Sequence, residues 1–251
     1  MKMYYVISEL LKFKKLKLKL FCYLFLLIFL KLKAYGNIDK IDSNGNYIAF
    51  PGITVLSHIN RDELNIWKQL YNNLNKSKII KEYYSLLPVE SYHLTLINLY
   101  TKAYTSKNNE DHWRNFIIKK NKMFISLKNY LEENTFLPSI QTMNIVLPKM
   151  SNNTIAIEVP LTQEQKEKIN KISNHFNLSK KVPKPFHITL AYSYKLIPSK
   201  IYLEIQSEFN KIVTENLLQY NMPLNFEEPK IYYFHDMTLF KKWNQNIKEI
   251  K

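Results

Sequence analysis

The sequence predicts one compact unit of the α+β class in which the order strand, helix, strand, helix occurs twice. Two observations support this fold class. Segments rich in β-branched residues alternate with segments whose apolar residues recur every three or four positions, as expected for strands and amphipathic helices. In addition, no Gly/Ser linker, acidic block or low-complexity tract divides residues 37–251. The composition, with 46% hydrophobic and 23% charged residues, is that of a folded globular protein.

The first half is expected to contain two strand–helix pairs. A β-branched segment over residues 47–59 predicts the first strand. Asn60, with Glu63 three residues later, has the spacing of a helix N-cap, and apolar residues follow at helical intervals. The second pair is a strand over residues 91–100 and a helix over residues 111–131.

The second half repeats this order. Thr162 and Gln165 form a capping box, which predicts the start of a helix with an apolar stripe. The other expected elements are strands over residues 140–147, 154–159 and 186–194, a helix over 199–217, and one or two closing strands within 230–240.

The first 36 residues differ from the rest of the chain. They contain eight lysines and one acidic residue, and an 11-residue apolar run, Leu20–Leu30, is followed by Ala34-Tyr35-Gly36. This order predicts a cleavable secretory signal peptide, with an uncleaved signal anchor or a membrane-surface helix as alternatives. The run is shorter than the ~20 residues of a transmembrane helix. We expect residues 37–251 to be exported, periplasmic or secreted, as a single monomeric domain without stable membrane insertion.

The composition excludes several kinds of site. Three glycines cannot supply a dinucleotide-binding loop, a phosphate-binding loop or a nucleophile elbow. One cysteine excludes an intramolecular disulfide framework and a multi-cysteine zinc site. The net charge is +15, but nearly half of it lies in residues 1–36 and the rest is almost all lysine. The charge is therefore background rather than a sign of nucleic-acid binding.

One motif occurs in both halves. It is His93-Leu94-Thr95-Leu96 in the first half and His187-Ile188-Thr189-Leu190 in the second. Residues i and i+2 of a strand share a face, so each histidine is expected beside its threonine while the apolar residues enter the core. Two imidazoles facing one cleft form an acid–base pair near neutral pH. The hydroxyls can donate to phosphoryl oxygens, and the arrangement requires no metal or other cofactor.

These two motifs, 94 residues apart, resemble those of the 2H phosphoesterase superfamily. Its members include RNA 2′,3′-cyclic phosphodiesterases and cyclic nucleotide phosphodiesterases. The segments LLPVESYHLTL, PFHITLAYSY and FHDMTLF are most similar to a branch without an assigned substrate. The resemblance covers roughly residues 46–240 and implies two lobes, each an antiparallel sheet with outer helices, around a central cleft.

The resemblance also implies the chemistry of the site. His93 and His187 would be the catalytic acid and base, and Thr95 and Thr189 would bind phosphate. The implied reaction is metal-independent hydrolysis of a cyclic phosphate, or of a 2′-5′ or 2′,3′-type phosphodiester, in a nucleotide or RNA end. One histidine would activate water and the other would protonate the leaving ribose oxygen, with the assignment open. Only two arginines occur, neither near a motif, so an arginine-type phosphate contact would have to come from lysine or tyrosine.

Other residues near the motifs are weaker candidates. We expect substrate contacts from residues that flank the motifs or end a neighbouring strand, with simple packing as the alternative: Tyr92, Tyr192, Tyr194, Lys184 and His58. His235-Asp236 has no third metal ligand at a suitable spacing, so no metal site is expected.

Two other functions remain alternatives on the same fold. One is a non-catalytic nucleotide- or RNA-binding module. The other is an exported interaction protein, in which the two histidines would lie apart, buried and bonded to backbone. The distinguishing observation is whether the four motif side chains converge on one open cleft.

Overall fold

The computed structural model describes residues 40–146, 153–220 and 222–244. All of them belong to the unit Asn37–Lys251. The predicted signal peptide, residues 1–36, lies outside the described residues. Within the described ranges, no helix is both long enough and apolar enough to cross a membrane.

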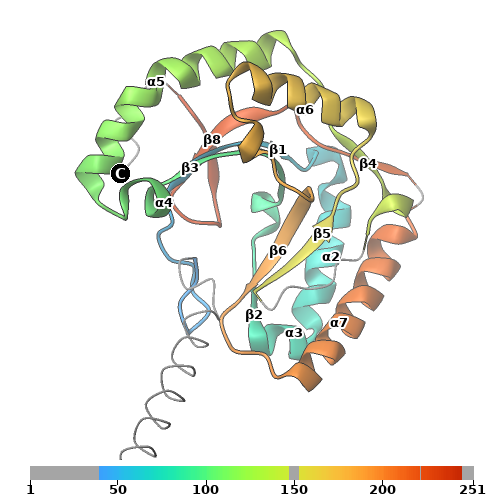
Figure 1. Ribbon diagram of the computed structural model, residues 1–251. Helices are drawn as coiled ribbons and strands as arrows, with labels where there is room; N and C mark the ends of the chain where they lie inside the picture. The colour runs from blue at the N-terminus through green and yellow to red at the C-terminus, as the bar shows by residue number, and fades with distance from the viewer. Residues whose placement is uncertain (1–39, 147–152, 221, 245–251) are drawn as a thin grey trace, which may run out of the picture. The chain divides into compact units, whose positions relative to one another are not determined.

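The first sheet has four antiparallel strands in the order β3-β1-β8-β9. Its central strand β1 (Gly52–His58) lies between β3 (His93–Thr101) and β8 (Lys230–Phe234), and β9 (Phe240–Lys242) closes the edge. The long helix α5 (Glu110–Glu133) arches over this sheet and contacts β8 (Figure 1). The C-terminal strands therefore complete a sheet that begins in the first half of the chain.

The second sheet has three antiparallel strands in the order β2-β6-β5. They are β2 (Tyr84–Leu86), β6 (His187–Ser193) and β5 (Thr154–Glu158). A two-stranded antiparallel ladder pairs β4 (Ser139–Gln141) with β7 (Pro223–Asn225). The expected antiparallel sheets are confirmed, but the two sequence halves do not form one lobe each, because β2 joins the sheet of the second half.

Two helices from the first half of the chain also pack with elements of the second half. Helices α2 (Leu64–Lys76) and α3 (Lys78–Tyr83) contact β2 and pack beside α7 (Ser199–Val213) (Figure 1). The remaining helices and helical turns are α4 (Lys102–Ser106), α6 (Gln163–His175), η1 (Arg61–Glu63), η2 (Val89–Ser91), η3 (Thr142–Asn144), η4 (Ser179–Lys181) and the π-helical turn η5 (Thr214–Leu218).

Local capping explains where two of the helices begin. The capping box of Thr162 and Gln165 is present, and it opens α6 as predicted. The Asn60 side chain accepts a hydrogen bond from the backbone N–H of Asp62 and opens the turn η1, so that α2 begins only at Leu64. Glu63 does not reach back to Asn60. Its carboxylate accepts the backbone N–H and the side-chain amide of Asn225, and so ties this turn to β7.

Several predicted boundaries change for local reasons. The first strand begins at Gly52 rather than at residue 47, because residues 40–50 form a separate turn with an isolated bridge between Ile41 and Tyr47. The strand expected over residues 140–147 ends at Gln141, where η3 begins. Two closing strands, β8 and β9, are present, although β9 extends beyond residue 240, and α3, β2, α4 and β7 were not predicted.

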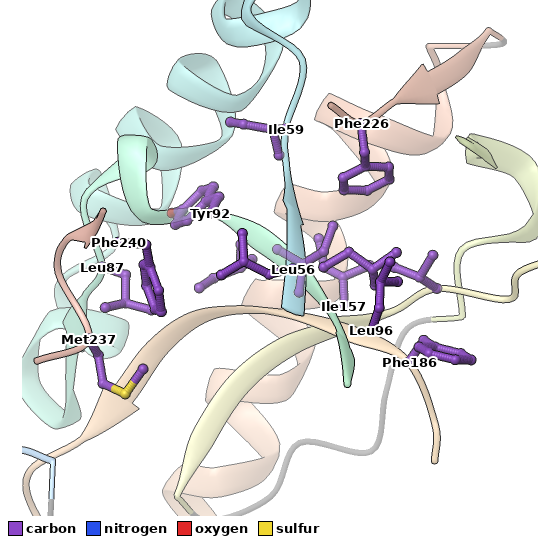
Figure 2. Packing of buried hydrophobic residues seen from close by; sticks show 14 of the residues in the cluster. Leu56, Ile59, Leu87, Tyr92, Leu96, Ile157, Phe186, Phe226, Met237 and Phe240 are labelled. Carbon is purple, nitrogen blue, oxygen red and sulfur yellow. The ribbon is translucent and has the colours of Figure 1, made fainter. Parts of the chain in front are cut away.

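The apolar residues of both motif strands enter the core. Leu94 and Leu96 of β3, and Ile188 and Leu190 of β6, are almost fully buried. Figure 2 shows Leu56 and Leu96 of the first sheet beside Ile157 of the second. One apolar cluster therefore joins the two sheets beneath the motifs.

Gly52 permits a close approach inside the first sheet. A Cβ atom at this position would lie 2.4 Å from Cζ of Phe234, the residue paired with it on β8. We predict that Gly52→Ala lowers the free energy of unfolding by about 1–3 kcal/mol, because the buried Phe234 ring must move. Urea denaturation measures this value. A double-mutant cycle with Phe234→Leu should show favourable coupling; unchanged stability of Gly52→Ala would contradict the packing described here.

Candidate active site

Both copies of the motif stand at the start of a strand. His93 is the first residue of β3 and His187 is the first residue of β6. In each strand the following residue is buried, and the threonine two positions after the histidine is half-buried on the histidine's face. The period of two in a strand thus separates the polar pair from the core.

The four motif side chains line one open cavity of about 360 Å³. His93 and Thr95 come from the first sheet, and His187 and Thr189 come from the second. The two strands also contact each other directly. The structure therefore brings together the four residues that the sequence singles out, and the arrangement with two separated histidines is not observed.

Each imidazole is oriented by a backbone carbonyl two residues earlier. His93 Nδ1 lies 2.6 Å from the carbonyl oxygen of Ser91, and His187 Nδ1 lies 3.1 Å from that of Pro185. A carbonyl oxygen only accepts hydrogen bonds, so Nδ1 carries the proton in both rings. In a neutral ring this leaves the lone pair on Nε2, which has no hydrogen-bond partner among the described residues. Both histidines are thus held in the tautomer that offers Nε2 for proton transfer.

The two histidines differ in their surroundings. The His93 ring packs 4.3 Å from the ring of Phe240 and 6.2 Å from that of His58, measured between centroids. Burial lowers the pKa of His93 to about 3; the Ser91 carbonyl opposes this shift, and the charges of His58, His187 and Lys40 add to it. His187 is exposed to solvent. His93 is therefore a neutral imidazole at physiological pH.

A β-bulge follows each motif at the same position. The pairing of β1 with β3 changes register between Thr95 and Ile97, and the pairing of β5 with β6 changes between Thr189 and Ala191. The extra residue is the fourth residue of the motif in both strands. A bulge turns the following side chains to the opposite face.

The bulges bring one further side chain from each strand into the cavity. Asn98 on β3 and Tyr192 on β6 both lie five positions after their histidine, and both line the cavity. The Thr54 hydroxyl on β1 donates a 3.0 Å hydrogen bond to the carbonyl of Ile97, beside the first bulge. The cavity thus has three corresponding positions from each strand, at the histidine, at two residues beyond it and at five residues beyond it.

Of the five weaker candidates, Tyr192 alone lines this cavity. The structure places the other four side chains elsewhere. Tyr92 is fully buried, packs edge-on against Trp67 and belongs to the core cluster shown in Figure 2. His58 packs 4.8 Å from Tyr232 behind His93, with Nδ1 3.3 Å from the Tyr92 carbonyl, and burial lowers its pKa.

Tyr194 and Lys184 lie on other surfaces. The Tyr194 hydroxyl donates to the backbone carbonyl of Lys81, and its ring borders a separate hollow near Gly45. Lys184 lines a different groove, beside a cis peptide bond to Pro185. Tyr194 directly follows β6 and Lys184 precedes it. Nearness to the motif in sequence therefore does not place these side chains in the cavity.

The structure also adds cavity residues that the motifs did not indicate. They come from segments outside the motif strands or from beyond the bulges, and include Lys40, Phe50, Asn98, Tyr104, Lys181 and Phe240. Phe50 and Tyr104 form an edge-to-face pair with centroids 6.1 Å apart, and the Tyr104 side chain is largely exposed. The shortage of arginine was the one sequence signal that pointed to lysine at this site.

The remaining histidines and acidic residues form no metal cluster. Across the described residues, no group of three or more His, Cys, Asp or Glu side chains is placed to hold an ion. Asp236, beside His235, instead accepts hydrogen bonds from the backbone N–H and hydroxyl of Thr238. His175 stacks on Tyr130 with centroids 4.6 Å apart.

Several known proteins are similar to this chain in sequence or in fold. Residues 40–135 match the family model 2H-phosphodiest, described as a domain of unknown function (DUF1868). The uncharacterized protein 127L of Invertebrate iridescent virus 6 is 26% identical over 223 residues, which cover 79% of this chain and 92% of that protein.

Two solved structures give weaker sequence likenesses. The conserved protein of unknown function ATU0111 from Agrobacterium tumefaciens str. C58 is 14% identical, with a TM-score of 0.53 over 81% of this chain and 89% of that one, and so shares the fold. Kluyveromyces marxianus Usb1, solved with uridine monophosphate, is 9% identical with a TM-score of 0.39 over 76% of this chain and 98% of that one. The family model covers the first motif, and the second copy lies beyond its end on the same cavity. The resemblance to the 2H phosphoesterase superfamily seen in the motifs is confirmed by the match of this family model over residues 40–135.

Proposed function

We propose that this protein is a metal-independent phosphodiesterase that hydrolyses a cyclic phosphate, or a 2′-5′ or 2′,3′-type phosphodiester, in a nucleotide or RNA end. The observation that carries this proposal is the convergence of two histidines and two threonines on one cavity, with both rings held in the same tautomer. The cavity volume of about 360 Å³ is at the small end of ligand sites, which suits a mononucleotide or a nucleotide end.

His93 is the general base in this proposal. Its imidazole is neutral because burial lowers its pKa, and the Nε2 lone pair can accept a proton from water. As the ring becomes charged, the hydrogen bond from Nδ1–H to the Ser91 carbonyl strengthens and stabilises the imidazolium. In this proposal His93, rather than His187, is the base, a choice that the sequence left open.

His187 is the general acid. Its side chain is exposed to solvent, whereas burial lowers the pKa of His93 and disfavours the charged form of that ring. With Nδ1–H bonded to the Pro185 carbonyl, the second proton of the imidazolium is on Nε2 and can be donated to the leaving oxygen. The two motif copies therefore divide the acid and base roles through their different exposure.

Thr95 and Thr189 hold the phosphate between the two rings. Each hydroxyl is on the face of its histidine, two residues further along the strand, and can donate to a non-bridging oxygen. Water forms a new bond to phosphorus and gives a proton to His93. The bond from phosphorus to the ribose oxygen breaks, and that oxygen receives the proton of His187.

We predict that His93→Ala and His187→Ala each reduce kcat/KM by a factor of about 10²–10⁴, the usual contribution of one general acid or base. Product formation should be followed on 2′,3′-cyclic nucleotides, cyclic-phosphate-ended RNA and 2′-5′ oligonucleotides, and EDTA should leave the rate unchanged. His175→Ala is the matched control, because His175 lies on a helix surface against Tyr130. Saturable binding without product from any substrate would instead identify a non-catalytic binding module.

The lowered pKa of His93 predicts a stability profile. In the unfolded chain histidine takes up a proton near pH 6.5, whereas the folded protein does so only near pH 3. The unfolded state therefore binds more protons between these values, and the free energy of unfolding should fall as the pH is lowered through this window, by up to about 1.4 kcal/mol per pH unit from this group. Urea titrations from pH 7 to pH 4 measure it. His93→Gln should flatten the profile, leaving the smaller part that comes from His58.

We also propose that the chain is exported through a signal peptide in residues 1–36. The basic segment, apolar run and small residues before Asn37 support this location. Sequencing the N-terminus of protein recovered outside the cytoplasm should give Asn37 as the first residue. Recovery of the uncleaved chain from the membrane fraction would favour a signal anchor.

A further inference from the structure

One lysine that lines the cavity belongs to neither strand–helix repeat. Lys40 lies before the first strand, in the turn formed by residues 40–50, and it lines the cavity together with the four motif residues. We propose that Lys40, positioned by Tyr192, is the residue that binds the non-bridging phosphoryl oxygens of the substrate by charge. This inference rests on the proposed phosphodiesterase function and assigns a binding residue within it.

Lys40 is held against the second motif strand. Its Nζ donates a 3.2 Å hydrogen bond to the hydroxyl of Tyr192, the residue that the bulge turns into the cavity. The same ammonium lies 4.9 Å from the centroid of the Tyr192 ring and 5.1 Å from that of Phe50. Because the Tyr192 oxygen accepts from Lys40, its own O–H remains free to donate to a second acceptor.

Within the part of the chain that the structure describes, no carboxylate neutralises the ammonium group of Lys40. Other lysines pair with acidic neighbours, as Lys128 does with Glu132 and Lys168 with Glu164, but among the described residues no acidic side chain forms an ion pair with Lys40. A half-buried charge without a counter-ion is unfavourable unless an anion completes it. The cavity that Lys40 faces is the one expected to hold a phosphate.

The charge of Lys40 acts on the His93 imidazole. It is one of the charges that lower the pKa of His93. Lys181, the other lysine of the cavity, is exposed and lies 5.3 Å from the ring centroid of Tyr100. Lys40 therefore has the closer electrostatic connection to the site of proton transfer.

The backbone around Lys40 is fixed by several hydrogen bonds. The Lys40 carbonyl accepts from the N–H of Ile48, and the N–H of Phe50 donates to the carbonyl of His235. The Tyr47 hydroxyl donates to the carbonyl of Ser85 on β2. The turn is thus anchored to β2 and to the segment after β8, so the backbone that carries Lys40 is held in place before a ligand binds.

The first test is binding of inorganic phosphate and of a nucleoside 2′-monophosphate, measured by calorimetry on the purified protein. Lys40→Gln should raise both Kd values about tenfold or more, Lys40→Arg should restore most of the affinity, and Tyr192→Phe should have a smaller effect. Lys195→Gln is the matched control, because Lys195 lies next to Tyr194 and outside the cavity. Thermal melting confirms that each variant is folded.

The second test is the NMR titration of His93, which needs no turnover. Its pKa should rise in Lys40→Gln, since a repelling charge is removed, and should stay low in Lys40→Arg. If phosphate binding depends on Lys40 but no substrate is hydrolysed, the inference holds and the proposed function fails. If wild type hydrolyses a substrate while folded Lys40→Gln keeps the wild-type phosphate Kd, kcat/KM and His93 pKa, the function holds and the inference is overturned. Wild-type protein that binds neither phosphate probe also overturns it.

Discussion

The site depends on the alternation of side chains along two strands that share one core. In β3 and β6 the residues between histidine and threonine, and directly after threonine, are buried in the cluster that joins the sheets. A slip of one residue in either strand would move leucine or isoleucine into the cavity and imidazole into the core. The cost of exposing those apolar side chains and burying the polar ones fixes the register. Core packing, rather than any contact within the cavity, therefore determines that the two histidines line the same cavity.

The two motif histidines differ in solvent exposure because only the first sheet is extended by additional strands. The closing strands β8 and β9 extend the first sheet, and Phe240 of β9 packs against His93. The described part of the second sheet has no equivalent extension, and His187 stays exposed. A repeat that is symmetric in its motif is thus asymmetric in solvation. The proposed division into base and acid follows from where the C-terminal strands are added, which the motifs themselves do not encode.

Local patterns in the sequence predicted the fold class, the capping box of Thr162 and the four motif residues, because each depends on spacings of two to four positions. They did not predict which helices cover which sheet, since β2 and its helices cross to the other lobe. They also missed Asn98, because a bulge changes the alternation only where the partner strand pairs. Lys40 was missed for a related reason: 152 residues separate it from Tyr192, and nothing in its own segment marks that contact.

The turn formed by residues 40–50 has a consequence for where this domain begins. Both sheets and both motifs lie after Pro51, so a boundary drawn from secondary structure alone would start the domain at β1. Such a fragment would keep the strands that carry the motif histidines and threonines, and it would lose the ammonium group of Lys40 that lines the cavity. The turn also places Ile41 and Phe50 in the core, so a domain that starts at β1 would lose buried apolar contacts as well as this ammonium group. An alignment of relatives by their strands alone would leave this turn out, because it belongs to neither repeat.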